Sequence, residues 1–185
     1  MPVLKKISYL CLTFALLACS MSFAPPQLPA ARGYQVKAVF LFNFSQFVEW
    51  PANAFTSAQA PIVIGILGDD PFGSFLDETV SGEKVNGHPL LVQRYNNVKE
   101  IKSCHILFIN LAETNMTENV LANLKGRNIL TVSDAGEFLQ QGGMIRFFVK
   151  SNKIQLQINL DAARAGNLVI SSKLLRLAEI FVPDK

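Results

Sequence analysis

The chain has 185 residues, half of them hydrophobic, and its 17 lysines and arginines face 14 acidic residues. Two of the basic residues, Lys5 and Lys6, lie in the N-terminal segment, so the remaining chain carries an excess of only one positive charge. This balance excludes the basic footprint of a nucleic-acid-binding protein, and the length favours one domain with one hydrophobic core.

The N-terminus has the layout of a secretory signal. Lys5 and Lys6 precede an apolar run from Ile7 to Ala18, which is interrupted only by one serine and one threonine. A run of this length is too short to span a bilayer, and a positive segment before it is typical of a signal peptide. We therefore expect the rest of the chain to be translocated out of the bacterial cytoplasm.

Two kinds of cleavage are consistent with this leader. Ordinary cleavage after small residues would fall near Ser20 or Ala24. The sequence up to Cys19 resembles a lipoprotein signal instead, in which this cysteine becomes the lipidated first residue and anchors the protein. Three prolines then give a stiff spacer before the folded part. The expected division is a signal peptide over residues 1–24, a spacer over 25–33 and a single domain over 34–185.

Only one cysteine remains in the expected mature domain. Cys11 lies in the leader and Cys19 is either removed or lipidated, which leaves Cys104 alone. An exported protein usually pairs its cysteines, so a lone thiol at the start of an apolar run is best explained as a small buried hydrophobic residue. A redox or intermolecular role is the alternative.

The first expected element is a helix from Tyr34 to Trp50, ended by Pro51. A period of 3.6 residues predicts that one apolar face carries Val36, Val39, Phe40, Phe44, Phe47 and Trp50. Phe42 falls on the opposite, polar side of that helix.

Strand-like and helical segments then alternate. We expect strands at Ile62–Leu67, Leu90–Tyr95, His105–Leu111 and Ile129–Val132. We expect the helices between them from Asp70–Pro71 to Val80, from Thr117 to Gly126, and from Ser133–Asp134 to Leu139.

Near the C-terminus the alternation of strands and helices gives way to two consecutive strands. Met144–Val149 and Ile154–Leu160 are separated by four residues and predict an antiparallel hairpin at the edge of the sheet. A last helix is expected from Ser171 or Ser172 to Phe181. The expected fold is therefore α/β, a three-layer sandwich with a mostly parallel mixed sheet and a C-terminal antiparallel hairpin.

No group of residues predicts catalysis, a metal site or a cofactor. His88 and His105 are the only histidines and lack the spacing of metal ligands, and no serine sits in a nucleophile elbow. A ligand cleft could form where parallel strands end, and the residues expected there are Gly68, Asp69, Asp70, Ser133 and Asp134. Simple helix capping is the competing interpretation of the same residues.

The aromatic residues suggest a protein interface. The chain has 14 phenylalanines, and Phe42 with the helix end at Trp50, Pro51 and Phe55 forms an unusually apolar group. Exposed aromatic clusters are typical of protein–protein contacts, so these four residues are the expected partner-binding surface. Packing in the core is the alternative.

The sequence resembles the YfiR-like family of bacterial periplasmic proteins over almost the whole expected domain. The most specific segment is residues 34–51, YQVKAVFLFNFSQFVEWP. Six further segments continue the resemblance in the same order: 65–73 (GILGDDPFG), 104–108 (CHILF), 130–134 (LTVSD), 142–145 (GGMI), 157–159 (QIN) with 162–163 (AA), and 168–175 (LVISSKLL).

The resemblance implies a regulator and not an enzyme. It implies a homodimer that binds the periplasmic domain of an inner-membrane diguanylate cyclase, lowers cyclic di-GMP and limits biofilm formation, and is sequestered by an outer-membrane lipoprotein. It also implies redox-sensitive disulfides, and here the sequence departs from the pattern. Cys104 matches a family cysteine but has no partner in the expected mature domain, so an intramolecular disulfide switch cannot operate.

Overall fold

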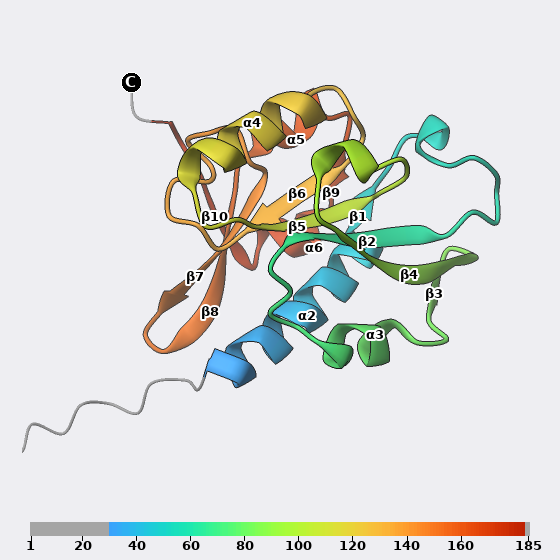
Figure 1. The fold of residues 1–185 in the computed structure, drawn as a ribbon, viewed down its shortest axis with the longest axis horizontal. Helices are drawn as coiled ribbons and strands as arrows, with labels where there is room; N and C mark the ends of the chain where they lie inside the picture. Colours follow the sequence, from blue (N-terminus) through green and yellow to red (C-terminus); the bar gives the residue numbers. More distant parts are fainter. Residues whose placement is uncertain (1–29, 184–185) are drawn as a thin grey trace, which may run out of the picture.

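The computed structural model describes residues 30–183, and its centre is one large sheet (Figure 1). The predicted leader, with Cys11 and Cys19, lies outside the described residues. Within residues 30–183 the sheet has eight strands, which lie side by side in the order β10 (Ala178–Ile180), β8 (Lys153–Ile158), β7 (Ile145–Lys150), β6 (Leu130–Ser133), β5 (Ile106–Asn110), β2 (Ile62–Gly68), β4 (His88–Tyr95) and β3 (Lys84–Val85).

The middle of this sheet is parallel. Strands β4, β2, β5, β6 and β7 all run in one direction, whereas β3 and β8 pair antiparallel with β4 and β7. The hairpin of β7 and β8 turns at Ser151 and Asn152, both with positive φ. A short second sheet pairs β1 (Val48–Glu49) with β9 (Val169–Ile170). The predicted α/β fold with a mostly parallel mixed sheet and a C-terminal hairpin is confirmed.

Helices cover both faces of the sheet (Figure 1). Ile106 and Phe108 of β5 point to one side, where they join a core with Leu41 and Phe44 of α2 (Ala30–Phe47) and with α3 (Ser74–Val80). Leu107 and Ile109, the alternate residues, join a second core on the other side. This side is covered by α4 (Thr114–Leu124), whereas Ala163 of α5 (Leu160–Ala165) belongs to the first core; cover on both sides explains why the central strands are apolar on both faces.

Two 3-10 turns, η2 (Ala52–Ala54) and η3 (Val98–Glu100), and the short helix α6 (Ser172–Leu175) complete the described elements. None of the helices within residues 30–183 has the length and hydropathy needed to cross a membrane.

The predicted orientation of the first helix is only partly correct: Phe44 is buried and Phe40, Phe47 and Trp50 pack against the core, but two of the six predicted residues do not. Val36 and Val39, expected in the core, are 36% and 42% exposed, whereas Lys37 and Ser45 are buried with Leu41. Lys37 can be buried because its amino group pairs with Asp134 at 2.5 Å, and the Ser45 hydroxyl donates to a backbone carbonyl of the same helix. The buried face therefore contains two polar residues that the apolar pattern excluded.

The ends of several elements also differ from the prediction. The last helix is limited to α6, and the chain then forms β10 beside β8, so β8 is not the edge strand. The expected helix from Ser133 to Leu139 is a series of turns. The helix expected after Asp70 begins only at Ser74, because the Asp70 carboxylate caps the turn before it.

Candidate functional site

Open α/β sheets bind ligands at the carboxyl ends of their parallel strands, at the point where successive connections leave on opposite faces. Here the connection after β2 leads to α3 on one face, and the connection after β5 leads to α4 on the other. The switch point therefore lies between Gly68 and Asn110. Two residues of the predicted cleft, Gly68 and Asp69, are at this position.

The switch point is closed by the chain itself. The Asp69 N–H donates to the Asn110 carbonyl at 3.1 Å, and the Asn110 side-chain amide donates back to the Asp69 carbonyl at 3.0 Å. Gly68 has φ of 90°, and a Cβ atom there would lie 2.1 Å from the Asn110 carbonyl oxygen. The two strand ends are thus too close for a ligand to enter between them in this conformation.

Asp70 is part of a surface network. Its carboxylate accepts from the N–H groups of Phe72 and Gly73 and pairs with the Arg94 guanidinium at 2.7 Å. Arg94 also holds Asp77 at 2.5 Å, and this hydrogen bond lowers the pKa of Asp77. These contacts fix the start of α3 on β4. They support the capping interpretation of Asp70.

Ser133 and Asp134 lie at the end of β6, two strands away from β2. The Ser133 hydroxyl donates to the Ile109 carbonyl at 2.7 Å, so it joins β6 to β5. Asp134 contacts α2: it lies 2.5 Å from the Lys37 amino group and 3.2 Å from the Tyr34 hydroxyl. Burial and the Asp134 charge raise the pKa of Tyr34. The five predicted cleft residues therefore form two separate groups.

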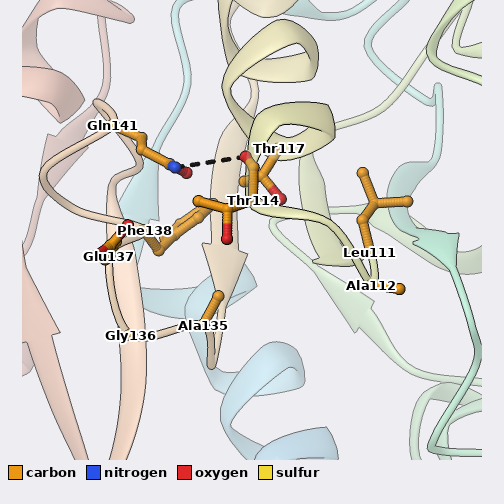
Figure 2. Close-up of a pocket in the computed structure, with 9 residues that line it drawn as sticks. All are labelled: Leu111, Ala112, Thr114, Thr117, Ala135, Gly136, Glu137, Phe138 and Gln141. Atoms are coloured by element: carbon orange, nitrogen blue, oxygen red, sulfur yellow. Dashed lines mark hydrogen bonds between the residues drawn. The ribbon is translucent and has the colours of Figure 1, made fainter.

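A small pocket opens between the end of β5 and the turns after β6 (Figure 2). Its volume is about 190 Å³, and the Gln141 side-chain amide donates across it to the Thr114 carbonyl at 3.4 Å. Figure 2 shows Thr114, Thr117 and Glu137 as the other polar side chains around it. This pocket has room for a few water molecules or a small ion, and nothing in its lining forms a nucleophile–base pair.

Two larger concavities flank the sheet. One, of about 550 Å³, is an apolar groove between α4 and α5. The other, of about 350 Å³, lies between α2, the loop after β6 and the β7–β8 hairpin. Its lining combines charged and apolar side chains: Lys37, Asp134, Gly136, Arg146, Phe147, Phe148, Val149 and Ile154. Of the predicted cleft residues, only Asp134 lines one of these two cavities. Arg146 lines the same cavity, and the sequence analysis did not identify it as a site residue.

The four predicted partner-binding residues are half-buried. Phe42, within α2, packs part of its ring against the core and leaves the rest exposed, so it projects into solvent less fully than the helical pattern predicted. The Trp50 indole donates to the His105 carbonyl at 3.2 Å, and Pro51 precedes the turn η2. The Phe55 ring is stacked between His88 and His105, with centroid distances of 4.2 and 4.6 Å.

Cys104 is buried at the start of β5. Burial raises the pKa of its thiol to about 12, so the reactive thiolate is scarce at neutral pH. This agrees with the prediction of a small buried hydrophobic residue. Within residues 30–183, no three His, Cys, Asp or Glu side chains are grouped so that they could hold a metal ion.

A family model described as YfiR/HmsC-like matches residues 34–179. The chain belongs to the YfiR/HmsC-like family. The resemblance inferred from the sequence motifs is thereby confirmed over most of the chain, from the start of α2 to β10. A search of curated proteins finds no match to the chain. Membership of this family is consistent with a regulatory role and names no partner.

Proposed function

We propose that this protein is a periplasmic regulator that binds the periplasmic domain of an inner-membrane diguanylate cyclase and holds the enzyme inactive. Membership of the YfiR/HmsC-like family over residues 34–179 is the observation that carries this proposal. Restraint of the cyclase lowers cyclic di-GMP and limits biofilm formation. A homodimer is the proposed active form, and an outer-membrane lipoprotein is the proposed partner that sequesters it.

The leader supports the periplasmic location. Lys5 and Lys6 before an apolar run direct export, and cleavage then releases the domain into the periplasm. Lipidation of Cys19 would instead tether the same domain to a membrane surface. The mass of the mature N-terminus distinguishes the two forms.

A binding role also fits the chemistry of the domain. The Cys104 thiol is inaccessible and protonated, and burial lowers the pKa of His105 while its Nδ1 accepts from the Val63 N–H. Neither side chain can act on a substrate from inside the core. Binding without catalysis is therefore the activity that these side chains favour.

The proposed docking surface lies along α2 and at its end. It includes Phe42, Trp50, Pro51 and Phe55, which expose part of their apolar surface. Val39, one turn before Phe42, adds an aliphatic side chain that is largely open to solvent. Aromatic side chains anchored on one side and open on the other are common at the centres of protein interfaces.

The proposal is tested by deleting the gene and measuring cyclic di-GMP. We expect the level to rise, and we expect the full-length chain to restore it. A matched chain that lacks residues 1–24 stays in the cytoplasm and should not restore it. Crosslinking in the periplasm should recover the cyclase. Unchanged cyclic di-GMP together with no recovered cyclase rules the proposal out.

A small-molecule binding domain is the second candidate function. It is favoured by the 350 Å³ cavity beside Asp134, where charged and apolar side chains converge. A thermal-shift screen of envelope metabolites tests it. A ligand that raises the melting temperature supports this function, and no shift with any compound removes it.

A further inference from the structure

The β7–β8 hairpin extends past the end of its neighbour β6. β6 pairs with β7 only through Val132 with Ile145 and Ser133 with Arg146, whereas β7 continues to Lys150. Figure 1 shows the hairpin projecting from the sheet next to the first turns of α2. The 350 Å³ cavity lies in the angle between these elements, and the loop after β6 closes its base.

Charge in this cavity is not balanced. Lys37 is only 8% exposed, and its charge is compensated by Asp134 at 2.5 Å. Its amino group also lies 4.1 Å from the centre of the Tyr34 ring. Arg146 is a second cation on the same lining, and no ion pair joins it to a carboxylate within residues 30–183. The cavity therefore carries one uncompensated positive charge.

Not all N–H groups of the Arg146 guanidinium have a hydrogen-bond acceptor among the described residues. One terminal nitrogen, Nη1, donates to the Gly136 carbonyl. Its Nε atom is buried and has no partner among the described residues. The other terminal nitrogen, Nη2, makes no hydrogen bond there and is not enclosed, so it faces solvent. Nε and Nη2 lie on one edge of the guanidinium: Nη2 is the donor open to a ligand, and a carboxylate pairs with both atoms once a small shift of the Arg146 side chain uncovers Nε.

Apolar side chains stand next to this charge. Phe148 lies against the Arg146 guanidinium, 5.5 Å from its central carbon to the ring centre. Val149 and Ile154 face each other across the hairpin, and Val149 is 65% exposed. A buried donor without an acceptor, an unpaired cation and an exposed apolar wall each cost free energy in water. One ligand with an anionic head and an apolar body would compensate the cation and cover the apolar wall.

We propose that this cavity binds a small organic carboxylate, with Arg146 as the residue that anchors the carboxylate group. The apolar part of the ligand contacts Phe148, Val149 and Ile154, and the Lys37–Asp134 pair forms the polar wall. The site is separate from the proposed docking residues Trp50 and Phe55, and the inference rests on the second candidate function, because it names the ligand class for that same cavity. It would give the regulator an input from small metabolites.

The test uses benzoate as the probe, with benzamide as its neutral counterpart of the same shape. The protein is labelled with ¹⁵N, and the backbone amides and the arginine Nε–H signals are followed during titration. We expect benzoate to shift the Arg146 Nε–H signal and the amides of residues 133–136 and 146–149. Benzamide should cause no saturable shift, and inorganic phosphate, which lacks an apolar body, should bind more weakly than benzoate.

Arg146→Gln removes the anchoring charge and should weaken benzoate binding at least about tenfold. Arg164→Gln makes the same change of net charge at an exposed position on α5 and should leave binding unchanged. Equal binding of benzoate and benzamide, phosphate binding as tight as benzoate, or no saturable shift at all overturns the proposal. So does retained affinity in the Arg146 variant. If that variant does not fold, the comparison of benzoate, benzamide and phosphate on the unaltered protein still tests whether the cavity binds an organic carboxylate.

Discussion

At the scale of single residues, His105 is held in its neutral form. Its Nδ1 accepts from the Val63 N–H at 3.1 Å, so the ring proton is on Nε2, which is buried near the backbone of Ala54 without a well-formed hydrogen bond. The Phe55 ring covers one face of the imidazole. Burial lowers the pKa of His105; the backbone of Ala54 opposes this shift in part, and the neighbouring His88 adds to it. A proton on Nδ1 would also break the bond to Val63.

We therefore predict that acid destabilises the fold through this residue. Above about pH 6.5, the pKa of unfolded histidine, its contribution to stability is complete. As the pH falls from there towards the lowered pKa, the unfolded chain binds the proton more readily and that contribution is lost. His105→Asn keeps an acceptor for Val63 and does not titrate. The urea midpoint should fall more between about pH 7.5 and 5.5 in the unaltered protein than in this variant; equal falls contradict the prediction.

Gly68 is the residue with least freedom to change. Its φ of 90° is strained for any other residue, and a Cβ atom would collide with the Asn110 carbonyl. Gly73 has φ of 55°, and a Cβ atom there would meet no other atom within 4 Å, so it provides a matched control. Gly68→Ala should reduce the free energy of unfolding by about 2 kcal/mol more than Gly73→Ala, measured by urea denaturation. Similar losses in both variants would show that the strand ends separate easily.

At the scale of elements, one ion pair fixes how α2 lies on the sheet. Lys37 and Asp134 are 97 residues apart in sequence, and both are mostly enclosed. The pair attaches the first turns of α2 to the end of β6. The exposed pair of Arg164 and Asp161 lies within one helix and has no such role.

We predict that these two pairs differ in energy. A double-mutant cycle with Lys37→Met and Asp134→Asn should give a coupling free energy of at least about 1 kcal/mol, because each single change leaves an enclosed charge unpaired. The cycle of Arg164→Gln and Asp161→Asn should give less than about 0.5 kcal/mol. Urea denaturation of all six variants provides both values. Equal coupling in the two cycles would mean that solvent screens the Lys37–Asp134 pair fully.

This ion pair also explains why the sequence predicted α2 but not its orientation. Counting apolar residues on a helical period placed Val36 in the core and did not include Lys37 there. The outcome depends on Asp134, which is far away in sequence. The prediction of a last helix up to Phe181 was wrong for a related reason. Residues 178–180 have apolar side chains at both ends, and they form a strand because they lie beside the edge of β8.

At the scale of the whole molecule, the class of fold was predictable from local patterns. β2 and β5 are short, continuously apolar runs, and such strands need cover on both faces, which implies helical layers and parallel crossovers. The sites were less predictable. Arg146 is a single arginine within a strand, and its significance depends on the length of β7 relative to β6. No local signal in the sequence marks it.

The whole molecule also decides which surface can act on a partner. The sequence analysis included Phe42 in the interface, but its partial packing on the core means that Phe42→Glu should destabilise the fold. Val39 is 42% exposed on the same helix, so Val39→Glu should leave the melting temperature unchanged and abolish restraint of cyclic di-GMP. Leu91→Glu, at a position 46% exposed on β4, introduces the same charge elsewhere and should preserve restraint. If Val39→Glu retains full restraint in cells while remaining folded, the regulator does not dock through the outer face of α2, and the end of the helix at Trp50 and Phe55 becomes the surface to test.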